Sequence, residues 1–206
     1  IKGNKKFQIE GRSIIAAEVL KSFILSILKH DEQYAPFRIV ALEEKGRGED
    51  QVTYKLSNGK KVKLKGIIDR IDIKDGQVRV LDYKTGRDAK DFANISSLID
   101  REHNKRNKAV FQVFFYSYLF VKRNQSIDFQ RIVPGIFNSK DLFQEDFQAE
   151  IYNKDLKQLV YDYSEYHEDY ETILGELLEE IFNPQIPFDQ TDDEKKCKFQ
   201  LQYHKI

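Results

Sequence analysis

The sequence predicts an α/β fold in which helices flank a central, largely antiparallel sheet. A helical pattern near the N-terminus is followed by short strand patterns separated by hairpin turns, and helical spacing returns in the second half. At 206 residues the chain is long enough for one domain with a core, and there is little room for two. We therefore expect a single domain over residues 1–206.

The first predicted element is an amphipathic helix. Between Gly11 and His30 apolar residues recur at helical spacing, with lysine, serine and glutamate between them. The apolar stripe consists of Ile14, Ala17, Leu20, Ile24, Ile27 and Leu28. We expect this stripe to pack the helix against the rest of the molecule.

Four antiparallel strands are expected after this helix. The strand patterns cover residues 37–44, 51–56, 62–73 and 77–85, with hairpin signals at Ser57-Asn58-Gly59 and Asp75-Gly76. An Asp-Gly step between runs rich in Ile and Val is the strongest short-range signal for a two-residue β-hairpin turn. With Asp75 and Gly76 as the turn, Lys74 pairs with Gln77 and Asp69 faces Asp82.

Side-chain alternation divides this last hairpin into two faces of different character. One face carries Ile67, Asp69, Ile71, Ile73, Val78, Val80, Asp82 and Lys84, and the other carries Ile68, Arg70, Asp72, Lys74, Gln77, Arg79, Leu81 and Tyr83. The first face is apolar apart from two carboxylates and one lysine, so we expect it to be buried. The second is mostly charged, so we expect it to be wet or in contact with a polar partner, with a salt bridge between Asp72 and Arg79.

Asp69 and Asp82 place like charges opposite each other on the face that is expected to be buried. Opposed residues have Cβ atoms roughly 4.5–5.5 Å apart, and like charges there repel. Burying them without compensation costs several kcal/mol per ion. Two groups can offset this cost: the ammonium of Lys84, or a divalent cation of the Mg²⁺ type, which binds one or two carboxylates together with waters and substrate phosphates.

Lys84 lies two residues after Asp82 and therefore on the same face. In a phosphodiesterase such a lysine orients or deprotonates the attacking water, or stabilises charge on the transferred phosphate. The structural alternative is an ion pair between Lys84 and the two aspartates, because charge clusters of this kind also occur without function.

The second half of the chain predicts a polar connection and then alternating elements. Residues 86–108 are strongly charged and predict a loop with a short helix. Residues 109–121 are apolar almost all round, which predicts a helix buried on most sides, with Gln112 and Tyr116 inside it. A strand over 127–137 is expected to return to the sheet, and a long helix capped by Asn153 is expected to run through Phe182.

Charge and cysteine content limit the possible classes of function. The 34 basic and 34 acidic residues cancel, so no global positive field indicates nucleic-acid binding. Cys197 is the only cysteine, which excludes an internal disulfide and a thiolate-rich metal site and is compatible with a reducing cytosol.

The longest apolar stretch, 14–28, is interrupted by polar residues, so we expect neither a membrane span nor a signal peptide. Because the chain contains no methionine, we expect a fragment of a longer cytoplasmic protein.

Three motifs in order carry a resemblance to a known family. They are Gly66-Ile-Ile-Asp69-Arg70-Ile-Asp72, Leu81-Asp82-Tyr83-Lys84-Thr85-Gly86 and Gln112-Val-Phe-Phe-Tyr116. This succession resembles the motifs of the RecB/AddB-type branch of the PD-(D/E)xK nuclease superfamily. The resemblance implies a restriction-endonuclease-like fold, Mg²⁺- or Mn²⁺-dependent cleavage of DNA phosphodiesters, and a helicase or helicase-like subunit or domain as a partner.

The resemblance also implies roles for individual residues. Asp69 and Asp82 would be metal ligands, the Tyr83 backbone carbonyl would supply another oxygen, and Lys84 would be the catalytic lysine. Gln112 and Tyr116, one helical turn apart, would face the site and contact substrate or brace the lysine. The alternative for this last pair is a buried polar pair that the backbone satisfies.

Members of this family usually carry an acidic residue on the strand before the hairpin, and Glu43 or Glu44 fits. Strand parity does not decide between them, and we favour Glu43 as an additional metal ligand. The basic segment from Arg101 to Lys108 would either bind DNA phosphates or form a solvated loop.

Two features depart from the family pattern. A metal-binding histidine is normal on an upstream helix, but His30, the only histidine before Asp69, has no matching context. We therefore expect that ligand to be missing. Some AddB-like members also carry an iron–sulfur cluster on several cysteines, and with Cys197 alone we predict no cluster.

Three hypotheses follow. The first is a metal-dependent DNA nuclease domain of the kind found in bacterial recombination and repair proteins. The second is a catalytically inactive module with a nuclease fold that binds DNA or docks a subunit. The third is a purely structural domain whose charges form ion pairs.

Overall fold

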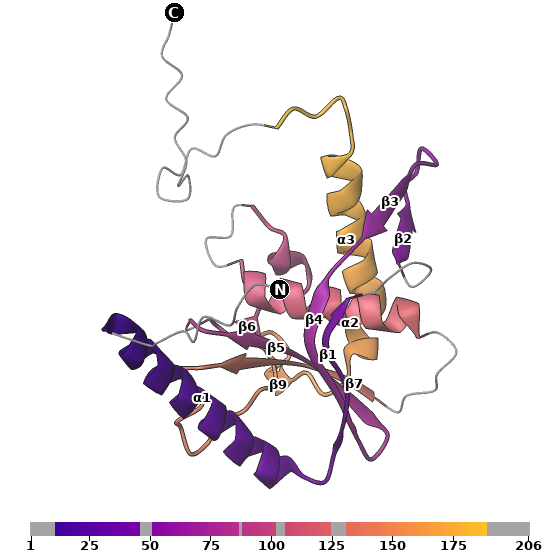
Figure 1. The fold of residues 1–206 in the computed structure, drawn as a ribbon. Helices are drawn as coiled ribbons and strands as arrows, with labels where there is room; N and C mark the ends of the chain where they lie inside the picture. The colour runs from indigo at the N-terminus through magenta and orange to yellow at the C-terminus, as the bar shows by residue number, and fades with distance from the viewer. Residues whose placement is uncertain (1–10, 46–50, 87, 102–105, 125–130, 189–206) are drawn as a thin grey trace, which may run out of the picture.

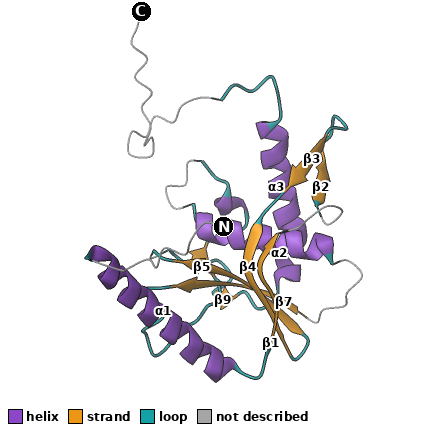
Figure 2. Cartoon of the chain, in the orientation of Figure 1, coloured by secondary structure: helices purple, strands orange, loops and turns teal. Residues whose placement is uncertain are grey.

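The computed structural model describes residues 11–45, 51–86, 88–101, 106–124 and 131–188. The helices are α1 (Arg12–Tyr34), η2 (Ser96–Leu98), α2 (Lys108–Arg123), η3 (Tyr163–Tyr166) and α3 (His167–Ile181), where η marks a 3-10 helix. The strands are β1 (Arg38–Lys45), β2 (Val52–Lys55), β3 (Lys61–Leu64), β4 (Ile67–Lys74), β5 (Gln77–Lys84), β6 (Asp91–Phe92), β7 (Arg131–Asn138), β8 (Tyr152–Asn153) and β9 (Gln158–Leu159). Figure 2 shows helices and strands in separate colours.

The central sheet confirms the predicted α/β class. Its strand order is β1-β4-β5-β7; β1, β4 and β5 are antiparallel, and β7 lies parallel to β5. Helix α2 contacts β5 and β7 and forms the centre of the main hydrophobic core. Helix α1 lies apart from α2 and runs beside the sheet (Figure 1). The mixed, mostly antiparallel sheet with flanking helices is consistent with a restriction-endonuclease-like fold.

The β4–β5 hairpin has the predicted turn and register. Asp75 and Gly76 have φ values of 50° and 77°, as a type I′ turn requires. Lys74 pairs with Gln77, and Asp72 faces Arg79, with which it forms the predicted salt bridge. The Asp-Gly step therefore predicted this pairing correctly.

The predicted long strand over 62–73 is wrong, because it is divided into β3 and β4 at residues 65 and 66. A Cβ on Gly66 would lie 2.9 Å from both Leu119 Cδ1 and Tyr116 Cε1, so the backbone passes directly against helix α2 here. The alternation of side chains also fails at this point. Ile67 is exposed, whereas Ile68 is fully buried in the core cluster that contains α2, the reverse of the predicted assignment.

The second face of the hairpin is buried, so of the two environments predicted for it, water or a polar partner, it has the second. Arg70, Asp72 and Arg79 are at most 8% exposed. The polar partner is α1 of the same chain, which contacts this face through Asp31 and Tyr34. These side chains neutralise one another, and the rings of Tyr34 and Phe37 cover the arginines, so the charged part of this face is buried.

Helix α1 exists as predicted and extends to Tyr34, but its predicted packing stripe is wrong. No residue of α1 is buried. Four members of the stripe are at least half exposed: Ile14, Leu20, Ile24 and Leu28. Ile27 is a member of the stripe that does pack, against the smaller core cluster; the helix also contacts the sheet through Asp31 and Tyr34, which face Arg70 and Arg79.

Helix α2 and strand β7 confirm the predictions for the middle of the chain. Nine of the α2 residues are buried, which fits a segment that is apolar almost all round. Strand β7 returns to the sheet beside β5, and residues 127–130 of the predicted strand lie outside the described residues. The described part of the polar connection before α2 contains β6 and the short helix η2, as expected of a loop with a short helix.

The long helix predicted from Asn153 to Phe182 is wrong in its first half. Asn153 lies in β8, and its side chain accepts a hydrogen bond from the Leu156 backbone N–H in the turn before β9. Lys157 in that turn has a φ of 53°, which a helix does not allow. The helical segment begins only with η3 and α3, after Asp162 accepts a hydrogen bond from the Ser164 N–H.

Within the described ranges, no helix has the length and apolar character needed to cross a membrane. Cys197 and the C-terminal tail lie outside the described residues, as do residues 102–105 of the predicted basic segment.

Candidate active site

The structure brings four of the predicted side chains into one connected chain of polar contacts. Asp82 and Lys84 lie on β5, and Gln112 and Tyr116 lie on α2. The Lys84 Nζ atom is 2.9 Å from Asp82 Oδ2 and donates a hydrogen bond of 2.6 Å to Gln112 Oε1. Gln112 Nε2 in turn donates to the Tyr116 hydroxyl at 2.7 Å. Lys84 is thereby held between a carboxylate and an amide carbonyl.

Asp69 joins this site from strand β4. The β4–β5 ladder is regular from the turn to the pair of Arg70 and Leu81. One residue further, the Asp69 Oδ2 atom accepts a hydrogen bond from the Tyr83 backbone N–H at 2.9 Å. A side chain thus replaces the ladder at the end of the hairpin, and it fixes Asp69 beside the residue between Asp82 and Lys84.

Asp82 is the least satisfied charge of the site. Its side chain is 3% exposed, and although Lys84 Nζ lies at ion-pair distance, no hydrogen bond of good geometry reaches the Oδ2 atom. Burial raises the pKa of Asp82; Lys84 opposes this shift, and the carboxylates of Asp69 and Asp88 add to it. A buried carboxylate that has one lysine at ion-pair distance and two acidic neighbours is short of positive charge.

This donor set fits a hard divalent cation. Mg²⁺ and Mn²⁺ prefer oxygen ligands, and Mg²⁺ is usually held by one or two carboxylates plus waters and substrate phosphates. Asp69 and Asp82 would supply those carboxylates, and the observation that favours them is the buried Oδ2 of Asp82, which has an ion-pair contact with Lys84 but no hydrogen bond of good geometry. No group of three or more His, Cys, Asp or Glu side chains with metal-binding geometry occurs in the described part of the chain.

Glu43 lies on β1 close to the level of Asp69. In the β1–β4 register Leu42 pairs with Arg70 and Glu44 with Ile68, so Glu43 is opposite Asp69. Its side chain is exposed, and its backbone has a φ of 47°. It does not complete a group of three metal-binding side chains, and the Glu44 side chain lies outside the described residues.

Asn107 positions the site helix and was not singled out from the sequence. Its side-chain oxygen accepts hydrogen bonds from the Ala109 and Val110 N–H groups, which makes it the N-cap of α2. Its side-chain nitrogen donates to the carbonyls of Ala89 and Asp91, so it ties the start of α2 to the loop after β5. An asparagine directly before an apolar helix is a recognisable capping signal.

Asp88 is a second residue that the sequence did not indicate. Its carboxylate contributes to the raised pKa of Asp82, and its backbone carbonyl accepts a hydrogen bond from Asn138 at the end of β7. It follows Lys84 by four residues in a charged loop, and no spacing in the sequence distinguishes it from the other acidic residues there.

Comparison with known proteins agrees with this geometry. A family model described as the PD-(D/E)XK nuclease superfamily matches residues 7–200. The chain belongs to this superfamily. Asp82-Tyr83-Lys84 has the D-x-K form that the family name describes, and Asp69 is an aspartate that precedes it on β4. No curated protein matches the sequence.

His30 of this PD-(D/E)XK protein is engaged elsewhere. Its Nε2 atom lies 2.9 Å from the Leu142 carbonyl oxygen, and its ring lies 4.5 Å from that of Phe147, centroid to centroid. Phe147 packs against the cluster around Leu81, a residue of the face that α1 covers. His30 is therefore not placed with Asp69 and Asp82.

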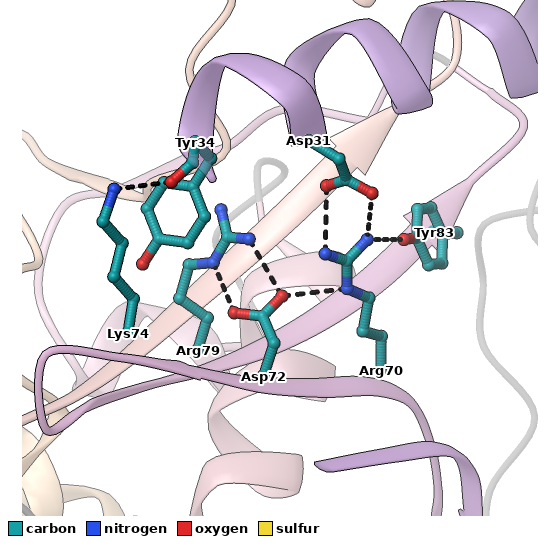
Figure 3. Close-up of polar contacts among 7 residues, drawn as sticks. All are labelled: Asp31, Tyr34, Arg70, Asp72, Lys74, Arg79 and Tyr83. Atoms are coloured by element: carbon teal, nitrogen blue, oxygen red, sulfur yellow. Dashed lines mark hydrogen bonds and ion pairs between the residues drawn. The ribbon is translucent and has the colours of Figure 1, made fainter. Parts of the chain in front are cut away.

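A second buried charge cluster lies on the α1 face of the same hairpin (Figure 3). Asp72 accepts hydrogen bonds of 2.8 Å from Arg70 Nε and from Nε and Nη2 of Arg79. Arg70 also donates to both oxygens of Asp31, at 2.7 and 2.9 Å, and to the Tyr83 hydroxyl at 3.2 Å. These contacts raise the pKa of Arg70 against the opposing effect of burial. Two aspartates and two arginines thus form a neutral cluster that attaches α1 to the sheet.

Proposed function

We propose that the chain is a metal-dependent DNA nuclease domain that hydrolyses phosphodiester bonds, of the RecB/AddB kind found in bacterial recombination and repair proteins. The observation that carries the proposal is the connected group of Asp69, Asp82, Lys84 and Gln112, in which one buried carboxylate oxygen has no hydrogen bond. The succession of three motifs supports the assignment to this branch.

Asp69 and Asp82 would hold Mg²⁺ or Mn²⁺, with the Tyr83 carbonyl and Glu43 as further oxygen donors. When bound, the ion lowers the pKa of a water ligand and neutralises charge on the phosphate. Asp69 is suited to this role because, in the described contacts, the Tyr83 N–H binds only its Oδ2 atom. Asp82 is suited to it because its buried Oδ2 atom accepts no hydrogen bond of good geometry.

Lys84 would orient the attacking water and stabilise the negative charge that develops on the phosphate. In the hydrolysis, a bond forms between the water oxygen and phosphorus, the bond to the leaving oxygen breaks, and the leaving oxygen takes up a proton. Gln112 and Tyr116 hold the lysine in position, because the amide that accepts from Nζ is itself fixed by the tyrosine hydroxyl. These two residues are positioning residues, or they contact the substrate directly.

The test is hydrolysis of labelled single- and double-stranded DNA by the full chain with Mg²⁺ or Mn²⁺. We expect Lys84→Ala to lower the rate by roughly 10²–10⁴-fold, the range typical of a group that assists proton transfer or charge stabilisation. Asp82→Ala should abolish metal-dependent cleavage. Lys21→Ala, at an exposed lysine on α1, is the matched control and should leave the rate unchanged. Cleavage that persists in both site variants would exclude this assignment.

An inactive nuclease-fold module that binds DNA or docks a subunit is the second candidate. It is favoured by one observation: the described residues supply only two carboxylates to the centre of the site, without a third metal-binding side chain. Calorimetric titration of Mn²⁺ separates the two candidates. Binding that is lost in Asp82→Ala supports the nuclease, whereas intact DNA affinity without Mn²⁺ binding supports the module.

The resemblance to RecB/AddB-type proteins also supports a wider setting. We propose that the domain is part of a longer cytoplasmic protein and acts beside a helicase or helicase-like subunit or domain. Co-purification of the natural full-length protein with an ATP-dependent DNA-unwinding activity would test this setting.

A further inference from the structure

The hairpin formed by β2 and β3 concentrates positive charge in a chain whose net charge is zero. Residues 51–68 contain five lysines and no aspartate or glutamate. The lysines are Lys55, Lys60, Lys61, Lys63 and Lys65, and all five are exposed. Residues 52–65 are called the lysine hairpin below. Within the described residues, no ion pair joins any of its lysines to a carboxylate.

The register of the lysine hairpin places three of these charges on one face. Lys55 pairs directly with Lys61, and Thr53 pairs with Lys63, so the three lysine side chains share the face opposite to Tyr54 and Val62. Like charges directly opposite each other in an antiparallel pair are destabilising. A face that carries this repulsion, with no ion pair to a carboxylate among the described residues, is complementary to a polyanion.

The other face of the hairpin is docked, which fixes the direction of the lysine face. Val52, Leu56 and Leu64 are buried in the main core. Tyr54 packs so closely on α3 that a Cβ on Gly175 would lie 2.3 Å from its hydroxyl oxygen.

The turn of the hairpin is anchored to α3 as well. The Ser57 backbone N–H and hydroxyl donate hydrogen bonds to the two carboxylate oxygens of Glu179. With its turn and its inner face both attached, the hairpin presents its lysines in a defined direction rather than on a free loop.

The lysine hairpin is continuous with the candidate active site. Strand β3 ends at Leu64, and Gly66, the point of contact with Tyr116, leads into β4 with Asp69. Figure 1 shows the hairpin extending beyond the end of β4 beside α3, at the end of the sheet away from α1. The lysine hairpin therefore leads, within two residues of its last strand, into the strand that carries Asp69.

We propose that the lysine hairpin binds the phosphate backbone of DNA next to the phosphodiester that the site cleaves. The inference rests on the proposed function for the identity of the polyanion. Lysine side chains contact phosphates as point charges and carry no sequence information. The hairpin would thus hold DNA of any sequence and position it, without taking part in the chemistry.

DNA binding in EDTA tests the proposal without hydrolysis. Fluorescence anisotropy of labelled single- and double-stranded DNA is measured at several salt concentrations for the wild type and the triple variant Lys55→Gln, Lys61→Gln, Lys63→Gln. We expect weaker binding, and a slope of log K against log salt that is smaller by about 2–3, roughly one unit for each phosphate that a lysine no longer neutralises. Comparison of the two DNA forms shows which one the hairpin prefers.

The matched control is the triple variant Lys21→Gln, Lys29→Gln, Lys157→Gln, which removes the same charge from exposed positions on α1 and in the turn before β9. It should bind DNA like the wild type. The hairpin variant should melt at the same temperature as the wild type or higher, because the repulsion between Lys55 and Lys61 is removed. Equal loss of affinity in both triple variants, or none in the hairpin variant, would overturn the proposal.

Steady-state cleavage separates this proposal from the nuclease assignment. With Mg²⁺, the hairpin variant should raise KM for DNA and leave kcat unchanged, whereas Lys84→Ala should lower kcat and still bind DNA in EDTA. If the hairpin variant cleaves DNA with the KM of the wild type, the proposal for the lysine hairpin is contradicted and the nuclease assignment stands. DNA binding that depends on the hairpin, without any cleavage, contradicts the nuclease alone.

Discussion

The two faces of the β4–β5 hairpin both bury charges, but only one of them satisfies every charge. On the α1 face, each oxygen of Asp72 accepts from an arginine, and each arginine pairs with an aspartate. On the α2 face, Asp82 retains a buried oxygen without a hydrogen bond beside two further carboxylates. The same two strands thus carry a fully paired cluster on one face and, on the other, a buried carboxylate that is short of positive charge.

This difference explains why similar residues have different roles. Breaking a buried and fully paired cluster leaves uncompensated charges, so its residues are needed for folding. A cluster that is already incomplete costs stability in the free protein, and a ligand that supplies the missing charge recovers it. The comparison predicts that the same substitution on the two faces changes stability in opposite directions.

The largest effect is expected for Asp72→Asn on the α1 face. The side chain is fully buried and accepts from both Arg70 and Arg79, so its loss leaves two guanidinium groups without their shared partner. Removing one partner of a buried ion pair costs about 3–5 kcal/mol. Urea unfolding followed by circular dichroism measures this loss. A loss below about 1 kcal/mol, the range of exposed pairs, would mean that the cluster does not hold α1 to the sheet.

Gly66→Ala is expected to have the next largest effect, and it acts on the α2 face. The new Cβ would lie 2.9 Å from Tyr116 Cε1 and from Leu119 Cδ1, and overpacking of this kind costs about 1–3 kcal/mol. Because Tyr116 holds Gln112 and Gln112 holds Lys84, the displacement should also lower the cleavage rate. Thermal melting and DNA cleavage are measured together. Wild-type values in both would show that the tyrosine does not position the lysine.

The hairpin and the site were predictable because local rules decide them. Asp75-Gly76 determines the register, and the spacing of Asp69, Asp82 and Lys84 determines which side chains meet. The burial of the charged face was not predictable, since it depends on Asp31, which is 39 residues away from Arg70 in the sequence. No apolar pattern indicates a helix that packs through charged and aromatic side chains.

The two errors in helix prediction have a common cause. In α1 the apolar stripe was assigned to the core, but the residues that contact the sheet are mainly polar. In residues 153–166, apolar side chains recur at helical spacing although the backbone forms two short strands and a 3-10 helix. Hydrophobic spacing indicates where a helix can form, but tertiary contacts decide whether it forms and which side is buried.

The smallest effect on stability, and the one with the opposite sign, is expected for Asp82→Asn without divalent cations. Burial raises the pKa of Asp82 above its ordinary value of 3.8, so the folded protein binds this proton more tightly than the unfolded chain. At neutral pH the ionised carboxylate therefore costs stability, and the uncharged asparagine should raise the melting temperature. The gain should shrink as the pH falls through the folded-state pKa and vanish below 3.8, because both states are then protonated.

Divalent cations should reverse the difference in stability between Asp82→Asn and the wild type. Mn²⁺ should raise the melting temperature of the wild type, since it binds the folded state, and should have no effect on Asp82→Asn, while Asp72→Asn should retain its response. A destabilised Asp82→Asn without Mn²⁺ would show that Asp82 is held as firmly as Asp72. The α2 face would then be a second structural ion-pair cluster, and the missing hydrogen bond at Asp82 Oδ2 would not indicate a binding site.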